Sequence, residues 1–238
     1  MANRIAADGA HVLEILRRSL KVKREDYVVL LSHDMDKDPF ALLVAIVLSQ
    51  NTNDKNSIRA YIQLRERIGV TLDRVLEARE EEIADAIRPA GLFERKARTI
   101  KLLANRLKQA GGSEVLLRMD PGRLRELLLS VPGVGKKTAD VFLSFYRKAP
   151  VFAVDTHAAR IAKRWGLVSR NATYDDISRA LLEFFGPGNS EEAHRLLIAL
   201  GRTFCRARNP RCTECPLRKL CPSSKAVNEV REQRFDTR

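Results

Sequence analysis

The chain has 238 residues, which is enough for one large or two modest domains, and 45% of them are hydrophobic, so a proper core can be buried. Lys and Arg outnumber Asp and Glu by 43 to 30, which suggests a polyanionic partner and salt-sensitive binding, although charge alone does not separate nucleic acid from an anionic membrane. The longest apolar run, Ala41–Leu48, is far too short to span a membrane, and the N-terminus lacks an apolar signal core, so we expect an intracellular protein of the cytoplasm or nucleoid.

Helical patterns follow one another along the chain, and no stretch with the two-residue period of a strand is long enough to matter. Residues 1–24 form an amphipathic pattern. Asp38 and Pro39 then suit the cap and first residue of a helix from Phe40 to about Gln50, which is apolar on every side and should be buried at the centre of a core. The other predicted helices cover residues 56–69, 73–79, 80–87, 94–110, 123–129, 138–145, 158–165, 174–185 and 191–200.

Two polar stretches between these helices have open interpretations. Ser49–Asp54, which follows the apolar helix, is either a cap and turn or a binding loop. Lys96 and Arg98, which follow a break at residues 88–92, suit either phosphate contacts or a solvated helix face. Asp140 lies one turn after Lys136, and a surface ion pair is the expected role.

The segment Val131–Ala139 joins two apolar helices by a tight turn. Pro132 ends the first helix, and Gly133 and Gly135 allow the backbone to reverse. Such a turn leaves backbone N–H groups unpaired at the start of a helix, here beside Lys136 and Lys137, and this combination favours an anion such as a DNA phosphate. The alternative is a plain corner in a helical protein.

An apolar segment, residues 150–154, leads into Asp155 eighteen residues after Lys137. Asp155 suits the N-cap of the helix that follows. The functional interpretation is a carboxylate aimed at Lys137, and the two interpretations are compatible.

All four cysteines lie between residues 205 and 221, in the spacing Cys-x6-Cys-x2-Cys-x5-Cys. In an intracellular chain this clustering indicates a metal site rather than disulfides, and the spacing alone leaves zinc and a four-iron cluster open. Several arginines surround the cysteines, with Glu214 as the single acidic residue, so folding around a metal would fix guanidinium groups on one surface.

At these residues the chain resembles the endonuclease III family of helix-hairpin-helix DNA glycosylases. The resemblance rests on Val-Pro-Gly-Val-Gly-Lys-Lys-Thr-Ala at 131–139, Val-Asp-Thr-His at 154–157 and the cysteine spacing, and it extends from about Pro39 to Cys221. It implies a [4Fe-4S] cluster held by Cys205, Cys212, Cys215 and Cys221. The loop after the apolar helix enters the duplex in this family, so Asn51, with Gln50 as its neighbour, takes the place of the family's Gln. The expected DNA contacts are Gln50, Asn51, Gly133, Gly135, Lys136, Arg206, Arg208 and Arg211.

The resemblance also implies the chemistry. Lys137 would attack C1′ of a flipped nucleotide, expel an oxidised pyrimidine and cut the strand by β-elimination, and Asp155 would stabilise the positive charge. The alternatives are a mismatch glycosylase acting on adenine or thymine, which generally lacks a lysine at this position, and a non-catalytic helix-hairpin-helix module with a zinc staple.

We therefore expect an all-α protein of two helical domains that acts on double-stranded DNA as a monomer. Residues 38–148 would form a helical domain that ends in the hairpin, and residues 1–37 with 149–238 would form the cluster domain. DNA would lie between the two domains, with Lys137 and Asp155 facing each other.

Overall fold

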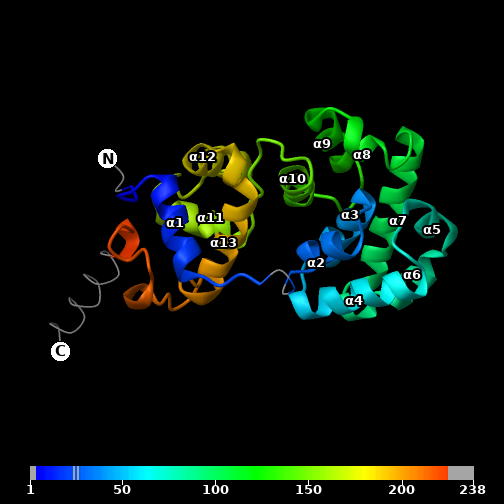
Figure 1. Ribbon diagram of the computed structural model, residues 1–238, viewed down its shortest axis with the longest axis horizontal. Helices are drawn as coiled ribbons and strands as arrows, with labels where there is room; N and C mark the ends of the chain where they lie inside the picture. Colours follow the sequence, from blue (N-terminus) through cyan, green and yellow to red (C-terminus); the bar gives the residue numbers. More distant parts are fainter. Residues whose placement is uncertain (1–3, 24, 26, 225–238) are drawn as a thin grey trace. The chain divides into compact units, whose positions relative to one another are not determined.

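The computed structural model describes residues 4–23, 25 and 27–224, and within them every regular element is an α-helix or a 3-10 helix (Figure 1). The all-α prediction is confirmed. The chain forms two compact units. One, here called the continuous unit, is Lys23–Ala149, and the other, the split unit, combines Met1–Val22 with Pro150–Arg238.

The continuous unit is built around α3, Pro39–Leu48, in which all ten residues are buried. Asp38 caps this helix by accepting a hydrogen bond from the Phe40 amide at 2.8 Å, as predicted. A helix that is apolar on every side must be covered on every side. The covering elements include α2, α4, α7 and α10. The helices of this unit are α2 (Val28–Met35), α3 (Pro39–Leu48), α4 (Asp54–Arg67), α5 (Leu72–Glu77), α6 (Glu80–Ala86), α7 (Phe93–Ala110), α8 (Val115–Arg118), α9 (Pro121–Leu129) and α10 (Lys136–Phe145).

Helix α2 is not among the helices that the sequence predicts. It packs against α3 and α4, and the His33 ring meets the edge of Phe145 of α10 at 5.4 Å between ring centres. Residues 23–37 therefore belong to the continuous unit, whereas the sequence placed them with the C-terminal part of the chain.

The structure contradicts both interpretations of Lys96, a phosphate contact and a solvated helix face, because the residue is only 3% exposed. Its Nζ donates hydrogen bonds to the carbonyl oxygens of Leu48, at the end of α3, and Ala90, at 2.9 and 2.8 Å. Burial lowers the pKa of Lys96 to about 8. The amine thus ties the end of α3 to the segment before α7, and it reaches no phosphate.

The hairpin between α9 and α10 is fixed by two contacts. Gly133 has φ +92°, and a Cβ there would lie 2.2 Å from Oγ1 of Thr99 in α7, so the turn approaches α7 too closely for any other residue. Arg125 of α9 donates to both carboxylate oxygens of Asp140 in α10, at 2.6 and 3.1 Å. The expected surface position of Asp140 is wrong, because the residue is 1% exposed. A buried carboxylate needs such a partner.

The split unit joins the N-terminal segment to the C-terminal helices. Its helices are α1 (Gly9–Ser19), α11 (Thr156–Arg164), α12 (Tyr174–Phe185) and α13 (Ser190–Thr203). The predicted helix over residues 1–24 is shorter than expected, since Asp8 caps α1 and Leu20 is extended. The amide of Ile5 bonds to the carbonyl of Trp165, and that of Ala6 to the carbonyl of Leu220. Trp165 is 2% exposed and belongs to the hydrophobic core of this unit.

No helix within the described residues is long and apolar enough to cross a membrane.

Replacing Gly133 with Ala should lower the free energy of unfolding by about 2 kcal/mol or more, because a positive φ and a contact with Thr99 both oppose the added methyl group. Gly135→Ala is the matched control, since φ there is −96° and a Cβ meets nothing within 4 Å. Chemical denaturation of the three proteins measures the difference. Equal losses in the two variants would show that the close approach of the hairpin to α7 is not a constraint.

Replacing Lys96 with Met tests the buried amine. The pKa of a lysine in an unfolded chain is about 10.4, whereas burial lowers that of Lys96 to about 8. Between these values the unfolded chain holds the extra proton, so stability gained from Lys96 rises with pH. We expect the stability difference between the native protein and Lys96→Met to grow in favour of the native protein from pH 8 to pH 10. Denaturant titrations at each pH measure it, and a constant difference would contradict the assignment.

Candidate nucleic-acid interface and metal centre

The hairpin presents a helix start to solvent. Gly135 is the N-cap of α10, and Lys136 and Lys137 are the first two residues of the helix. Gly133, Gly135 and both lysines are exposed. The first amide groups of a helix have no intrahelical partner, and the positive end of the helix dipole lies at the same place. This turn therefore suits an anion, with Lys136 and Lys137 beside it.

The polar loop after α3 lies against this hairpin. Nε2 of Gln50 donates to the carbonyl oxygen of Gly133 at 3.1 Å and to Oγ1 of Thr138 at 3.0 Å. Asn51, the next residue, is exposed and has φ 50°, which is unusual for a residue other than glycine. The structure thus brings Gln50 to the hairpin and holds Asn51 out from the protein surface.

Leu92 is a candidate that the sequence analysis missed. It is 54% exposed, one of two exposed large hydrophobic residues in the described part of the chain, and it has φ 49°. It stands at the N-cap position of α7, four residues before the buried Lys96. Its position after Gly91, in the break between two helical patterns, was the available signal. An exposed leucine in a strained conformation costs free energy that a binding role would justify.

Asp155 is the N-cap of α11, as predicted, and its Oδ1 accepts from the Ala158 amide at 2.7 Å. His157, in the first turn, contacts Arg160 through Nδ1 at 2.9 Å, and burial lowers the pKa of its ring. These contacts give the His157 ring a structural role within the split unit. Lys137 belongs to the continuous unit and Asp155 to the split unit.

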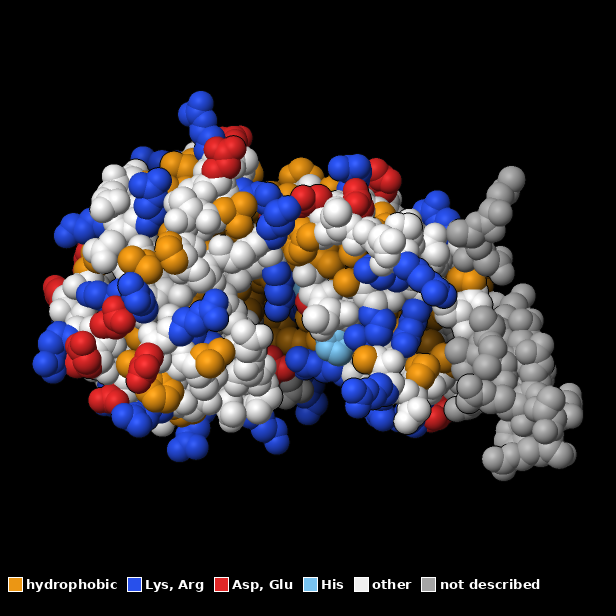
Figure 2. Space-filling view, turned by 180° about the vertical axis from the view of Figure 1, so that it is seen from behind, with side chains coloured by type: hydrophobic (Ala, Val, Ile, Leu, Met, Phe, Trp, Pro, Cys, Tyr) orange, Lys and Arg blue, Asp and Glu red, His pale blue; other side chains and the backbone are white. Residues whose placement is uncertain are grey.

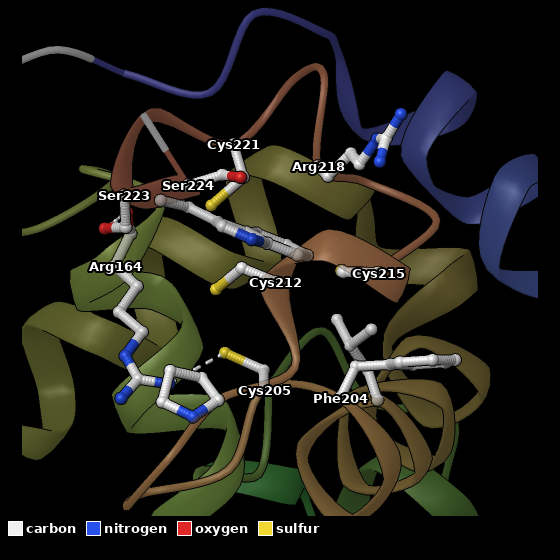
Figure 3. A pocket seen from close by; sticks show the side chains of 12 residues that line it. Arg164, Phe204, Cys205, Cys212, Cys215, Arg218, Cys221, Ser223 and Ser224 are labelled. Atoms are coloured by element: carbon white, nitrogen blue, oxygen red, sulfur yellow. Dashed lines mark hydrogen bonds between the residues drawn. The ribbon is translucent and has the colours of Figure 1, made fainter. Parts of the chain in front are cut away.

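The four cysteines surround one cavity of about 70 Å³ in the split unit, which Trp165 and Phe204 also line (Figure 3). The sulfur atoms of Cys205, Cys212 and Cys221 lie in one row in Figure 3. Among the described residues no three ligating side chains converge closely enough to hold a single metal ion. Four thiols spread around a cavity fit a multinuclear cluster, in which each iron binds its own cysteine.

Burial of two of these thiols favours a bound cation, whichever metal supplies it. It raises the pKa of the Cys215 thiol to about 11 and raises that of Cys221. A thiolate buried in this cavity needs a bound cation, and iron ions supply one.

Two arginines of α11 reach the cysteine loop, a long-range contact that no local sequence pattern predicts. Arg164 donates to Sγ of Cys205 at 3.2 Å and to the carbonyl of Arg206 at 2.7 Å. Arg160 donates to the carbonyl of Cys205 at 2.9 Å. The helix that begins at Asp155 therefore supports the loop that carries the cysteines.

The three arginines predicted to contact DNA differ in whether a carboxylate already binds them. Arg206 and Arg208 are exposed, whereas the guanidinium group of Arg211 forms an ion pair with Glu214 and lowers the pKa of that carboxyl. On the face of the split unit seen in Figure 2, Lys and Arg side chains gather with few Asp or Glu side chains among them. An anion would meet Arg206 and Arg208 without first displacing a carboxylate.

Comparison with known proteins gives a consistent result. Residues 44–187 match the HhH-GPD superfamily of base excision DNA repair proteins, and residues 205–221 match the iron-sulfur binding domain of endonuclease III. Endonuclease III of Sulfolobus acidocaldarius is 35% identical over 207 residues, which cover 87% of this chain and 92% of the relative. That of Bacillus subtilis is 33% identical over 191 residues, covering 77% of this chain and 81% of the relative.

Solved structures show the same similarity. A non-covalent endonuclease III–DNA complex superposes with a TM-score of 0.74 at 28% identity and covers 92% of this chain and 96% of its own. A trapped endonuclease III–DNA covalent intermediate has a TM-score of 0.69 at 29% identity, with coverage of 87% and 99%. A thermostable thymine-DNA glycosylase has the same fold, with a TM-score of 0.72 at 20% identity over 91% of this chain and 94% of its own.

Replacing Cys212 with Ala should abolish the yellow-brown colour and the bound iron, because each cysteine ligates one iron. Thr213→Ala is the control, since it changes the adjacent, exposed side chain. Iron and zinc analysis and the visible spectrum of the purified proteins measure the effect. A colourless native protein containing one zinc would contradict the assignment.

Proposed function

The chain belongs to the endonuclease III family of HhH-GPD base excision DNA repair proteins, and on this basis we propose that it is a bifunctional DNA N-glycosylase and AP lyase. Its substrates are oxidised pyrimidines in double-stranded DNA, and it acts as a monomer within the nucleoid. The observation that carries the proposal is the exposed Lys137 at the start of α10, directly after the hairpin turn.

The reaction uses the amine of Lys137 as a nucleophile. Nζ attacks C1′, the bond from C1′ to the base breaks, and the base leaves with the bonding electrons and takes up a proton. The opened sugar then carries a protonated imine with Lys137. Loss of a proton from C2′ then expels the phosphate at C3′ with the electrons of the C3′–O bond, so the strand is cut and that phosphate stays on the 5′ end of the downstream fragment. Water hydrolyses the imine and frees Lys137.

Asp155 is the second group that the proposed reaction uses. As the N-cap of α11 its carboxylate is held by the Ala158 amide, which fixes its orientation. A fixed carboxylate stabilises the positive charge that develops on the sugar as the base departs, and it assists the proton transfers.

DNA binding and base extrusion are assigned to the exposed groups. The hairpin amides at Gly133 and Gly135, with Lys136, hold a phosphate, while Arg206, Arg208 and Arg211 add contacts from the cysteine loop. The target base must leave the stack before C1′ can be attacked. Asn51 and Leu92 are the wedge residues, since both are exposed at positive φ and belong to one unit.

The cysteine ligands Cys205, Cys212, Cys215 and Cys221 hold the [4Fe-4S] cluster, which supplies no chemical step and fixes the fold of the loop that presents the arginines. Arg160 and Arg164 of α11 bind the same loop through its backbone. The cysteine loop is therefore fixed both by its cluster ligands and by the hydrogen bonds from Arg160 and Arg164 of α11.

Replacing Lys137 with Ala should abolish the covalent complex that borohydride traps between the protein and a duplex containing one thymine glycol or one abasic site, because no other amine occupies its position. Lys136→Ala is the matched control. It removes the neighbouring charge and should weaken binding while the trapped complex persists. Denaturing gel electrophoresis of labelled DNA measures both.

Each pattern of trapping has a distinct meaning. Trapping on the abasic site alone would retain the lyase and contradict the base substrate. Base release without trapping or strand cleavage would identify a monofunctional mismatch glycosylase. Tight binding with neither reaction would contradict catalysis altogether.

A further inference from the structure

Gln50 stands between two segments that the proposed reaction uses in different ways. One is the loop of residues 49–53 that carries Asn51, here called the wedge loop, and the other is the hairpin that carries Lys137. Its side-chain amide donates to Gly133 in the hairpin turn and to Thr138 in α10, at 3.1 and 3.0 Å. One side chain therefore joins the wedge loop to both ends of the turn.

The acceptors lie close to the groups that act on DNA. Thr138 follows Lys137 directly and is 4% exposed, so its hydroxyl lies inside the unit while the lysine is exposed. Gly133 belongs to the turn whose amide groups face solvent. The hydrogen bond to Thr138 therefore links Gln50 to the first turn of α10.

The wedge loop is held on both sides of Asn51, so its unusual backbone is imposed by its neighbours. Before Asn51, the Ser49 hydroxyl donates to the carbonyl of Ile46 at 2.7 Å, and Lys96 binds the carbonyl of Leu48. After Asn51, Asn53 caps α4 by accepting from the Asn56 amide at 2.9 Å. A non-glycine residue at φ 50° persists only where its surroundings fix it.

We propose that Gln50 is a positioning residue that couples entry of the wedge loop into the duplex to the placement of Lys137, through its hydrogen bonds to Gly133 and Thr138. The proposal rests on the proposed glycosylase and lyase function. It replaces the expected DNA contact of Gln50 with a contact inside the protein, and it leaves Asn51 as the residue of the loop that meets DNA.

The experiment measures wedge entry and imine formation separately. A duplex with 2-aminopurine beside a tetrahydrofuran site, which cannot form an imine, reports loop entry by fluorescence. A duplex with a natural abasic site reports imine formation by borohydride trapping in single turnover. The variants are Gln50→Met, which keeps the length of the side chain, Thr138→Val, which keeps its shape, and the double variant.

We expect Thr138→Val, which removes one partly buried hydrogen bond, to slow trapping about tenfold. Gln50→Met removes this bond and the one to Gly133 and should slow trapping at least as much, and the double variant should be no slower than Gln50→Met. The fluorescence change should remain, because the variants keep entry of the wedge loop into the duplex and lose only the rate of imine formation. Affinity for undamaged duplex should stay within about twofold, because no DNA contact is removed. Thr138→Ser, which retains the hydroxyl, should restore the native rate. Gln109→Met makes the same chemical change at the exposed end of α7 and should have no effect.

Other results would overturn the proposal. Unchanged trapping in Gln50→Met, or losses that multiply in the double variant, would show that the contact with Thr138 does not act on Lys137. Equal losses of the fluorescence change, the DNA affinity and the trapping rate would show that Gln50 only stabilises the fold. If Gln50→Met does not fold, the comparison of Thr138→Val with Thr138→Ser decides. Absence of trapping by the native protein would instead refute the proposed function itself.

Discussion

The complete burial of α3 is the constraint on which the continuous unit depends. A helix with no polar face is stable only when other helices enclose it, and α2, α4, α7 and α10 do so here. The loop that follows such a helix starts from a fixed point. Lys96 secures this point by binding the last carbonyl of α3, at Leu48. The position of Asn51 thus follows from a core requirement as well as from the contacts of the loop's own residues.

The same logic explains which features the sequence could predict. The α3 helix with its Asp38 cap, the hairpin turn and the Asp155 cap are set by residues close together in the chain, and each was predicted correctly. The family motifs likewise selected iron over zinc, which spacing alone left open. Local patterns suffice where the determining contacts are local.

Features set by distant contacts were missed or misjudged. Lys96 and Asp140 carry charges, so the sequence placed both at the surface, yet each is buried and bonds to a partner brought by another segment. The run Tyr27–Leu31 has a composition that suits a strand, and it becomes part of α2 because α3 and α4 offer an apolar surface. Arg160 and Arg164 belong to an ordinary helical pattern, and only the fold shows that they support the cysteine loop.

The division of the chain also sets an order for its folding during synthesis. Residues 23–149 emerge as an uninterrupted segment with their own core, so this unit can fold while the remainder is being translated. The N-terminal segment cannot, because Ile5 and Ala6 bond to Trp165 and Leu220. It must wait, with the apolar side of α1 uncovered, until its partners in the split unit have been translated. The segment that precedes the continuous unit is thus made before that unit but reaches its place after it.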